Sequence, residues 1–133
     1  MSYVLFFDGC SKGNPGIAGS GAVIYKDNEE IWSKSEFLDK QTNNYAEYKG
    51  LIAGLEYAVE KEIKSLIVKG DSMLVIKQMS GVYKVKSDNL VDLYERALEL
   101  KDQFESIEFI HVYREENVRA DELANELVLT PRP

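Results

Sequence analysis

Five apolar residues near the start of the chain, Tyr3 to Phe7, lead directly into Asp8. Aromatic and β-branched residues without polar alternation predict a strand that is covered on both faces. The carboxylate that follows has no helix to cap, and burying it unpaired would cost several kcal/mol. The chain must therefore form a layered structure around this strand in which Asp8 is not left unpaired.

The hydrophobic period predicts five strands and four helices. We expect strands at 3–7, 21–26, 30–38, 65–69 and 107–112, with Asp27 and Asn28 forming a hairpin turn. Helical spacing predicts helices at 44–59, 74–79, 90–104 and 120–128, the second ended by Gly81 and the last by Pro131. The order is β-β-β-α-β-α-α-β-α, without repeats or linkers. It predicts a single α/β domain, residues 1–133, with three antiparallel strands, two parallel strands and packed helices.

Composition excludes several classes of protein. With 133 residues the chain has enough length for a core, and a single cysteine (Cys10) and a single histidine (His111) exclude a disulfide framework and a Cys/His zinc site. Its apolar runs are too short to span a bilayer and its start lacks a signal-peptide pattern, so we expect a soluble, cytoplasmic protein. The net charge of −7 opposes nonspecific binding to nucleic acid. It indicates either a soluble surface or carboxylates grouped to bind cations.

Four acids occupy special places in this layout. Asp8 and Asp71 follow strands, Asp121 opens the last helix, and Glu47 lies in the first turn of the first helix. Ligands of α/β sheets collect at the carboxyl ends of strands, so these acids are expected to converge. Alternatively, Asp71 and Asp121 are helix caps and Glu47 belongs to a capping box with Asn44. Converging carboxylates without basic partners would favour Mg²⁺ or Mn²⁺.

Four segments together resemble type 1 ribonuclease H, and the resemblance covers essentially the whole chain. They are FDGCSKGNPG at 7–16, TNNYAE at 42–47, KGDS at 69–72 and RADELAN at 119–125. The resemblance implies the ribonuclease H-like fold, a five-stranded mixed sheet with helices on both faces. It also implies hydrolysis of the RNA strand of RNA–DNA hybrids to 5′-phosphate and 3′-hydroxyl ends. Asp8, Glu47, Asp71 and Asp121 would then hold two Mg²⁺ ions, with Mn²⁺ able to substitute.

The same resemblance implies a set of substrate-binding residues and one further catalytic residue. The substrate contacts would be Gly9, Cys10, Ser11, Asn14, Thr42, Asn43, Asn44, Lys84, Lys86 and Asn117. Turn formation is the alternative role of Asn14, and helix capping is that of Asn43 and Asn44. Cys10 is expected to line the groove and not to act as a nucleophile, because no histidine is near it in sequence.

Three departures from the bacterial pattern bring the chain closer to archaeal-like members. Met73 replaces a polar residue, and the segment from Gly81 to Ser87 replaces a longer basic insertion, which predicts weaker hybrid binding. Its lysines either bind the hybrid or form a solvated surface. The loop before Asp121 has the form x-x-R-E-E-N, so we expect Arg114 to contact phosphate as part of the catalytic machinery. We expect His111 to be a packed or rim residue.

Two rival functions remain open at this stage. The same metal site is compatible with cleavage of double-stranded RNA, and the same fold is compatible with a noncatalytic hybrid-binding module. Retention of all four acids argues against the second, because binding alone would favour bases. No membrane and no obligate protein partner is expected.

Overall fold

The first half of the chain forms an antiparallel meander. The computed structural model describes residues 2–129, beginning with β1 (Tyr3–Gly13), β2 (Gly16–Lys26) and β3 (Glu29–Gln41). The predicted hairpin turn is present, with positive φ angles of 49° at Asp27 and 72° at Asn28. The strands extend further than the apolar pattern predicts, because the β1–β2 ladder continues through polar residues as far as the pair Gly13 and Gly16.

The second half alternates helices and parallel strands. It contains α1 (Asn43–Glu60), β4 (Ser65–Gly70), α2 (Met73–Met79), α3 (Asp88–Lys101), β5 (Ser106–His111), a 3₁₀ turn (Arg114–Glu116) and α4 (Val118–Leu129). The sheet order is β3-β2-β1-β4-β5, with β1, β4 and β5 mutually parallel, which confirms the predicted mixed sheet. Pro131, the expected stop of the last helix, lies outside the described residues. Within residues 2–129, no helix has the length and apolar character needed to cross a membrane.

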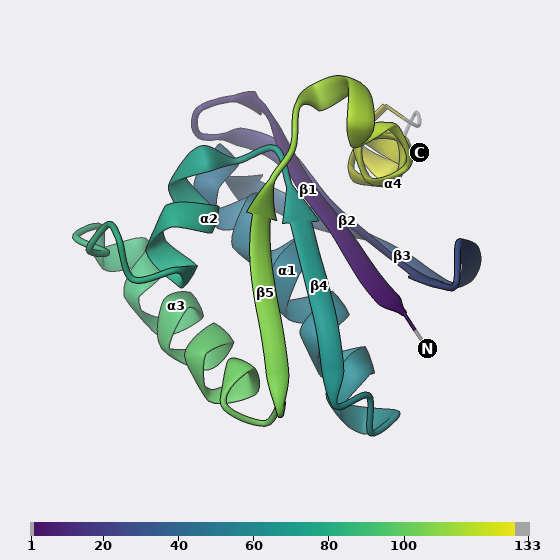
Figure 1. Cartoon of the computed structure of the whole chain (residues 1–133). Helices are drawn as coiled ribbons and strands as arrows, with labels where there is room; N and C mark the ends of the chain where they lie inside the picture. Colours follow the sequence, from purple (N-terminus) through teal and green to yellow (C-terminus); the bar gives the residue numbers. More distant parts are fainter. Residues whose placement is uncertain (1, 130–133) are drawn as a thin grey trace.

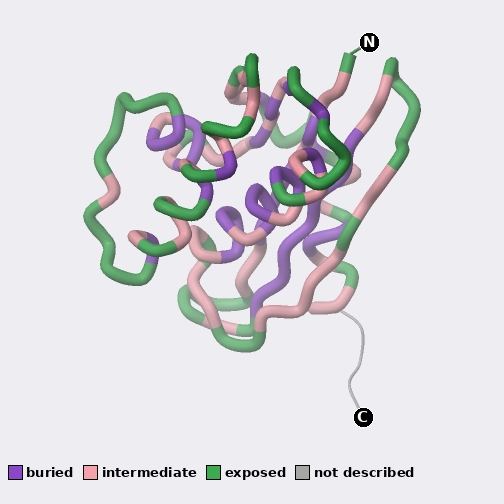
Figure 2. The backbone as a smooth tube through the Cα atoms, turned by 90° about the horizontal axis from the view of Figure 1, so that it is seen from below, coloured by how far each residue is buried: buried purple, intermediate pink, exposed green. Residues whose placement is uncertain are grey.

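The sheet separates α1 from α4 (Figure 1). Leu5 and Phe7 of β1 are fully buried in the larger core, which α1 and α3 complete on one face. Phe6 packs on the other face against a smaller cluster that includes Leu123 of α4. Figure 2 shows the buried segments gathered in the interior and the exposed segments at the turns and loops. The predicted covering of β1 on both faces is therefore confirmed, although Phe6 is only partly buried.

Two glycines bring the backbones of both helices close to β1 at Asp8. A Cβ atom on Gly9 would lie 2.3 Å from the backbone nitrogen of Glu47 in α1. A Cβ atom on Gly21, the β2 partner of Asp8, would lie 2.5 Å from the carbonyl oxygen of Ala120 in α4. Real Cβ atoms do not make contacts this short, so only glycine fits at these positions. The N-terminal parts of α1 and α4 consequently meet the sheet beside Asp8.

Candidate metal-binding active site

Three of the four predicted acids form a tight cluster. Asp8 of β1, Glu47 of α1 and Asp71, which directly follows β4, each place a carboxylate oxygen within 4.8 Å of the others. Asp8 and Glu47 are only 5% and 3% exposed. The three acids gather as expected where the parallel pairing of β1 with β4 ends, at Phe7 and Gly70, but Asp8 itself lies within β1, because that strand continues to Gly13.

Helix capping does not explain the positions of Glu47 and Asp71. The N-cap of α1 is Thr42, whose hydroxyl oxygen accepts the Tyr45 N–H at 3.2 Å, so Glu47 is not at the capping-box position. The N-cap of α2 is Ser72, whose hydroxyl accepts the Val75 N–H at 3.3 Å. The carboxylates of Glu47 and Asp71 are thus free of capping roles.

One backbone amide connects the two buried acids. The Gly9 N–H donates to Asp8 Oδ1 at 2.9 Å and to Glu47 Oε1 at 2.7 Å. The other oxygen of Glu47, Oε2, is buried and has no hydrogen-bond partner among the described residues. A single N–H therefore serves two carboxylates, and one carboxylate oxygen lacks a donor altogether.

The electrostatics of the cluster favour a bound cation. Burial raises the pKa of Asp8 from its ordinary 3.8 to about 7, and the charge of Asp71 adds to the increase. Burial and the neighbouring Asp8 raise the pKa of Glu47 well above its ordinary value. The ion pairs seen between described residues, Arg96–Glu56 and Arg119–Glu30, lie outside the cluster. The unpartnered Glu47 oxygen and the all-oxygen donor set fit a hard divalent cation.

Asp121 lies in the same cleft but outside the group of three. It is in the first turn of α4, and its own N–H donates to the Asn117 carbonyl at 3.0 Å, so it is not the capping residue. The side-chain amide of Asn125 donates to the Asp121 carbonyl at 2.9 Å and to Oδ1 at 3.2 Å. The carboxylate is therefore oriented by its own helix. Among the described residues, the compact metal-binding group comprises only the other three acids.

The acids line a polar cleft of about 460 Å³. Most of the residues that were predicted to contact substrate near the acids line this cleft. Its walls include all four acids with Arg114, Gly9, Cys10, Ser11 and Asn43, and further Lys12, Ser72 and Asn125. Sequence reasoning missed the last three. Asn125 was detectable, because it follows Asp121 by four residues on one helix face.

Several other predicted substrate residues do not line the cleft. Thr42 caps α1, and exposed Asn14 accepts the Asn43 N–H at 3.0 Å through its Oδ1. Asn44 is half-buried in the first turn of α1. Lys84 and Lys86 are exposed in the segment between α2 and α3. These residues are placed as surface or capping groups, and their contacts with a substrate remain predictions.

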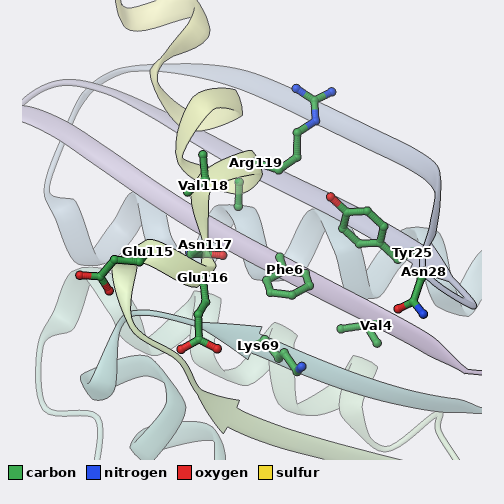
Figure 3. A pocket seen from close by; sticks show the side chains of 11 residues that line it. Val4, Phe6, Tyr25, Asn28, Lys69, Glu115, Glu116, Asn117, Val118 and Arg119 are labelled. Atoms are coloured by element: carbon green, nitrogen blue, oxygen red, sulfur yellow. The ribbon is translucent and has the colours of Figure 1, made fainter.

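The structure corrects the prediction made for Asn117. We expected a substrate contact, but the residue is 1% exposed and its side-chain amide donates to the carbonyl oxygen of Phe7 at 3.0 Å. Its side chain is used inside the protein, because the loop before α4 folds against β1. A separate cleft of about 340 Å³ on this side, floored by Phe6 and bordered by Glu116 and Arg119, shares no lining residue with the acidic cleft (Figure 3).

Cys10 and His111 occupy positions that do not favour chemical roles. Burial raises the pKa of the Cys10 thiol, and Sγ donates to the Ala124 carbonyl at 3.3 Å. His111 is half-buried at the end of β5 and does not line the acidic cleft. Its ring packs edge-on against the Tyr113 ring, with the ring centroids 5.6 Å apart. Cys10 lines the acidic cleft, as expected of a groove-lining residue, and the position of His111 agrees with the predicted packed or rim role.

A mixed five-stranded sheet with one acid on β1, Asp8, and another directly after β4, Asp71, is the framework of the ribonuclease H-like nucleases. The family model described as reverse transcriptase-like matches residues 6–127. The chain is 45% identical over 128 residues to a bifunctional protein of Mycobacterium tuberculosis and covers 35% of that protein. The solved N-terminal RNase H domain of the mycobacterial protein aligns over 95% of this chain and 98% of that domain, with a TM-score of 0.91 and 43% identity.

Two further solved structures agree with this assignment. RNase H1 from Halobacterium salinarum shares 38% identity over 96% of this chain and 98% of that one, with a TM-score of 0.91. LC11-RNase H1 in complex with RNA/DNA hybrid shares 36% identity over 94% of this chain and 95% of that one, with a TM-score of 0.87. The chain belongs to the ribonuclease H family, which confirms the resemblance seen in the sequence. It spans about a third of the mycobacterial relative and 61% of the halobacterial ribonuclease HI sequence.

Proposed function

We propose that the protein is an endoribonuclease that hydrolyses the RNA strand of RNA–DNA hybrids, leaving 5′-phosphate and 3′-hydroxyl ends. The observation that carries this proposal is the cluster of buried Asp8 and Glu47 with half-buried Asp71, which lacks a basic partner among the described residues. Its support from relatives is the hybrid bound to LC11-RNase H1, a structure with 36% sequence identity.

The four acids would hold two divalent ions, Mg²⁺ in the first place and Mn²⁺ as a substitute. Bound ions of this kind lower the pKa of an attacking water and stabilise the leaving oxygen. The unpartnered Oε2 of Glu47 supplies one ligand atom, and Asp8 and Asp71 supply others within 4.8 Å. Asp121 would complete the set from α4. Its backbone and carboxylate are fixed by Asn117 and Asn125.

Residues along the cleft would orient the substrate backbone. Arg114 is exposed at the wall of the cleft, and its guanidinium can hold a phosphate through two parallel hydrogen bonds. Gly9, Cys10, Ser11 and Asn43 line the same wall, where backbone and side-chain amides can contact sugar and phosphate. Such contacts read the shape of the hybrid and the 2′-hydroxyl and are insensitive to base sequence.

The test uses one labelled RNA presented as an RNA–DNA hybrid, as double-stranded RNA and as a single strand. Each form is incubated with Mg²⁺, with Mn²⁺ and with a chelator, using the wild-type protein and Asp8→Asn. We expect cleavage of the hybrid only, with either metal, and none with chelator or variant. Equal cleavage of double-stranded RNA would widen the substrate class. Hybrid binding without cleavage would instead indicate the noncatalytic module.

A further inference from the structure

Asn117 is a buried polar residue where the loop between β5 and α4 meets the sheet. Its Nδ2 donates to the Phe7 carbonyl at 3.0 Å, and Phe7 is the residue directly before Asp8. Figure 3 shows Asn117 between the start of α4 and β1, whereas the side chains of Glu115 and Glu116 point away from the helix. The amide therefore connects the loop to the strand one residue from the acid cluster.

The backbone of Asn117 makes two further connections. Its N–H donates to the Arg114 carbonyl at 3.0 Å, and its carbonyl accepts the Asp121 N–H at 3.0 Å. One residue thus joins the strand that carries Asp8 to the two cleft residues Arg114 and Asp121. Arg114 and Asp121, like Asn125, line the cleft from the segment that follows β5, so the strand pairings of the sheet do not place them.

The carbonyl oxygen of the side chain argues that stability alone does not explain Asn117. Its Oδ1 is buried and has no hydrogen-bond partner among the described residues. A buried acceptor without a donor lowers stability, and an apolar residue of similar shape would avoid that cost. What asparagine supplies here, and leucine would not, is the N–H directed at the Phe7 carbonyl.

We infer that Asn117 is a positioning residue, which holds Asp121 and Arg114 at a fixed place relative to Asp8. This inference rests on the proposed function, since it assigns Asp121 and Arg114 their roles in the same cleft. It predicts a fall in turnover with little change in KM, because a displaced loop misplaces reacting groups while most contacts with the hybrid remain. A misplacement of about 1 Å can cost roughly a hundredfold in rate.

The experiment compares Asn117→Leu and Asn117→Ala with Gln78→Met. Gln78 is also buried, and it accepts the Tyr48 hydroxyl at 2.5 Å, but it does not line the cleft. All three variants lose a buried hydrogen bond, and Asn117→Leu keeps the branched shape of the side chain while removing the unpartnered oxygen. Three quantities are measured: kcat and KM on the hybrid, the melting temperature, and the Mn²⁺ concentration that half-saturates thermal stabilisation without nucleic acid.

We expect Asn117→Leu and Asn117→Ala to lower kcat by roughly ten- to a hundredfold, with KM within about twofold of the wild type. Their half-saturating Mn²⁺ concentration should rise, whereas Gln78→Met should lower only the melting temperature. If the Asn117 variants behave like Gln78→Met, the residue is merely structural and the inference is overturned. A wild type that fails to cleave the hybrid refutes the proposed function instead. The Mn²⁺ measurement then decides the inference alone, and an unchanged or absent stabilisation overturns it.

Discussion

Replacing Asp8 with asparagine should stabilise the metal-free protein above pH 7 while abolishing cleavage. In the folded state burial raises the pKa of Asp8 to about 7, from an ordinary value of 3.8. Between these values the folded protein holds a proton that the unfolded chain has released. The free energy of unfolding therefore falls as the pH rises from about 4 to 7, and the loss stays constant above pH 7.

The size of the effect follows from the same two values. At about 1.36 kcal/mol per pH unit, the span from 3.8 to about 7 corresponds to at most roughly 4 kcal/mol. Asparagine has the same shape and no charge, and the Gly9 N–H keeps Glu47 as an acceptor. We expect a gain of about 1–4 kcal/mol at pH 8 and almost none at pH 4, or roughly 3–15 °C in melting temperature at pH 8.

Urea unfolding at pH 4, 6 and 8 with a chelator measures this profile, and Asp92→Asn at an exposed position of α3 controls for the change in net charge. Adding Mg²⁺ should stabilise the wild type at pH 8 much more than Asp8→Asn. A variant that is less stable than the wild type at pH 8 without metal would refute the electrostatic reasoning. Turnover near the wild-type value would refute the role of Asp8 itself.

Four other variants test the cleft, the basic segment and the core. Arg114→Ala should lower turnover by roughly ten- to a thousandfold, the range for one lost electrostatic contact, whereas His111→Ala should mainly lower the melting temperature; the reverse pattern would exchange their roles. Lys84→Ala combined with Lys86→Ala should raise KM and flatten its salt dependence with kcat nearly unchanged, and an unaltered KM would make them solvated surface residues. Leu55→Ala, at a fully buried site, should cost about 2–5 kcal/mol in urea unfolding, and a cost below 1 kcal/mol would contradict the packing seen there.

The acids could be predicted because each follows a strong local pattern. The apolar run before Asp8 forms the first half of the central strand β1, and the helical period after Asn44 turns Glu47 toward the core. Sequence could not separate the capping role of Glu47 from the metal-binding one. That distinction depends on Thr42, which takes the cap and leaves the carboxylate for Gly9. The sequence allows Glu47 either a capping hydrogen bond or a contact outside its helix, and the tertiary hydrogen bond from Gly9 decides between them.

Asn117 shows a different limit of sequence reasoning. A polar residue in a loop beside a predicted active site is naturally read as exposed and substrate-binding. Its burial depends on a carbonyl 110 residues away in the chain, that of Phe7, which no local pattern indicates. The ends of β1 and β2 were missed for a similar reason, since Lys12 and Ile17 pair as strand residues only because the opposite strand is there.

The absence of side chains at Gly9 and Gly21 means that main-chain atoms themselves touch where α1 and α4 meet the sheet. Contact distances between main-chain atoms are fixed by their radii, so the spacing there is already at its minimum. Changes in the size of core side chains elsewhere can open this spacing but cannot close it further. Substitutions among aliphatic residues of the core should therefore leave this minimum spacing unchanged. The two glycines set how closely α1 and α4 approach the sheet beside the acids, whatever combination of side chains fills the interior.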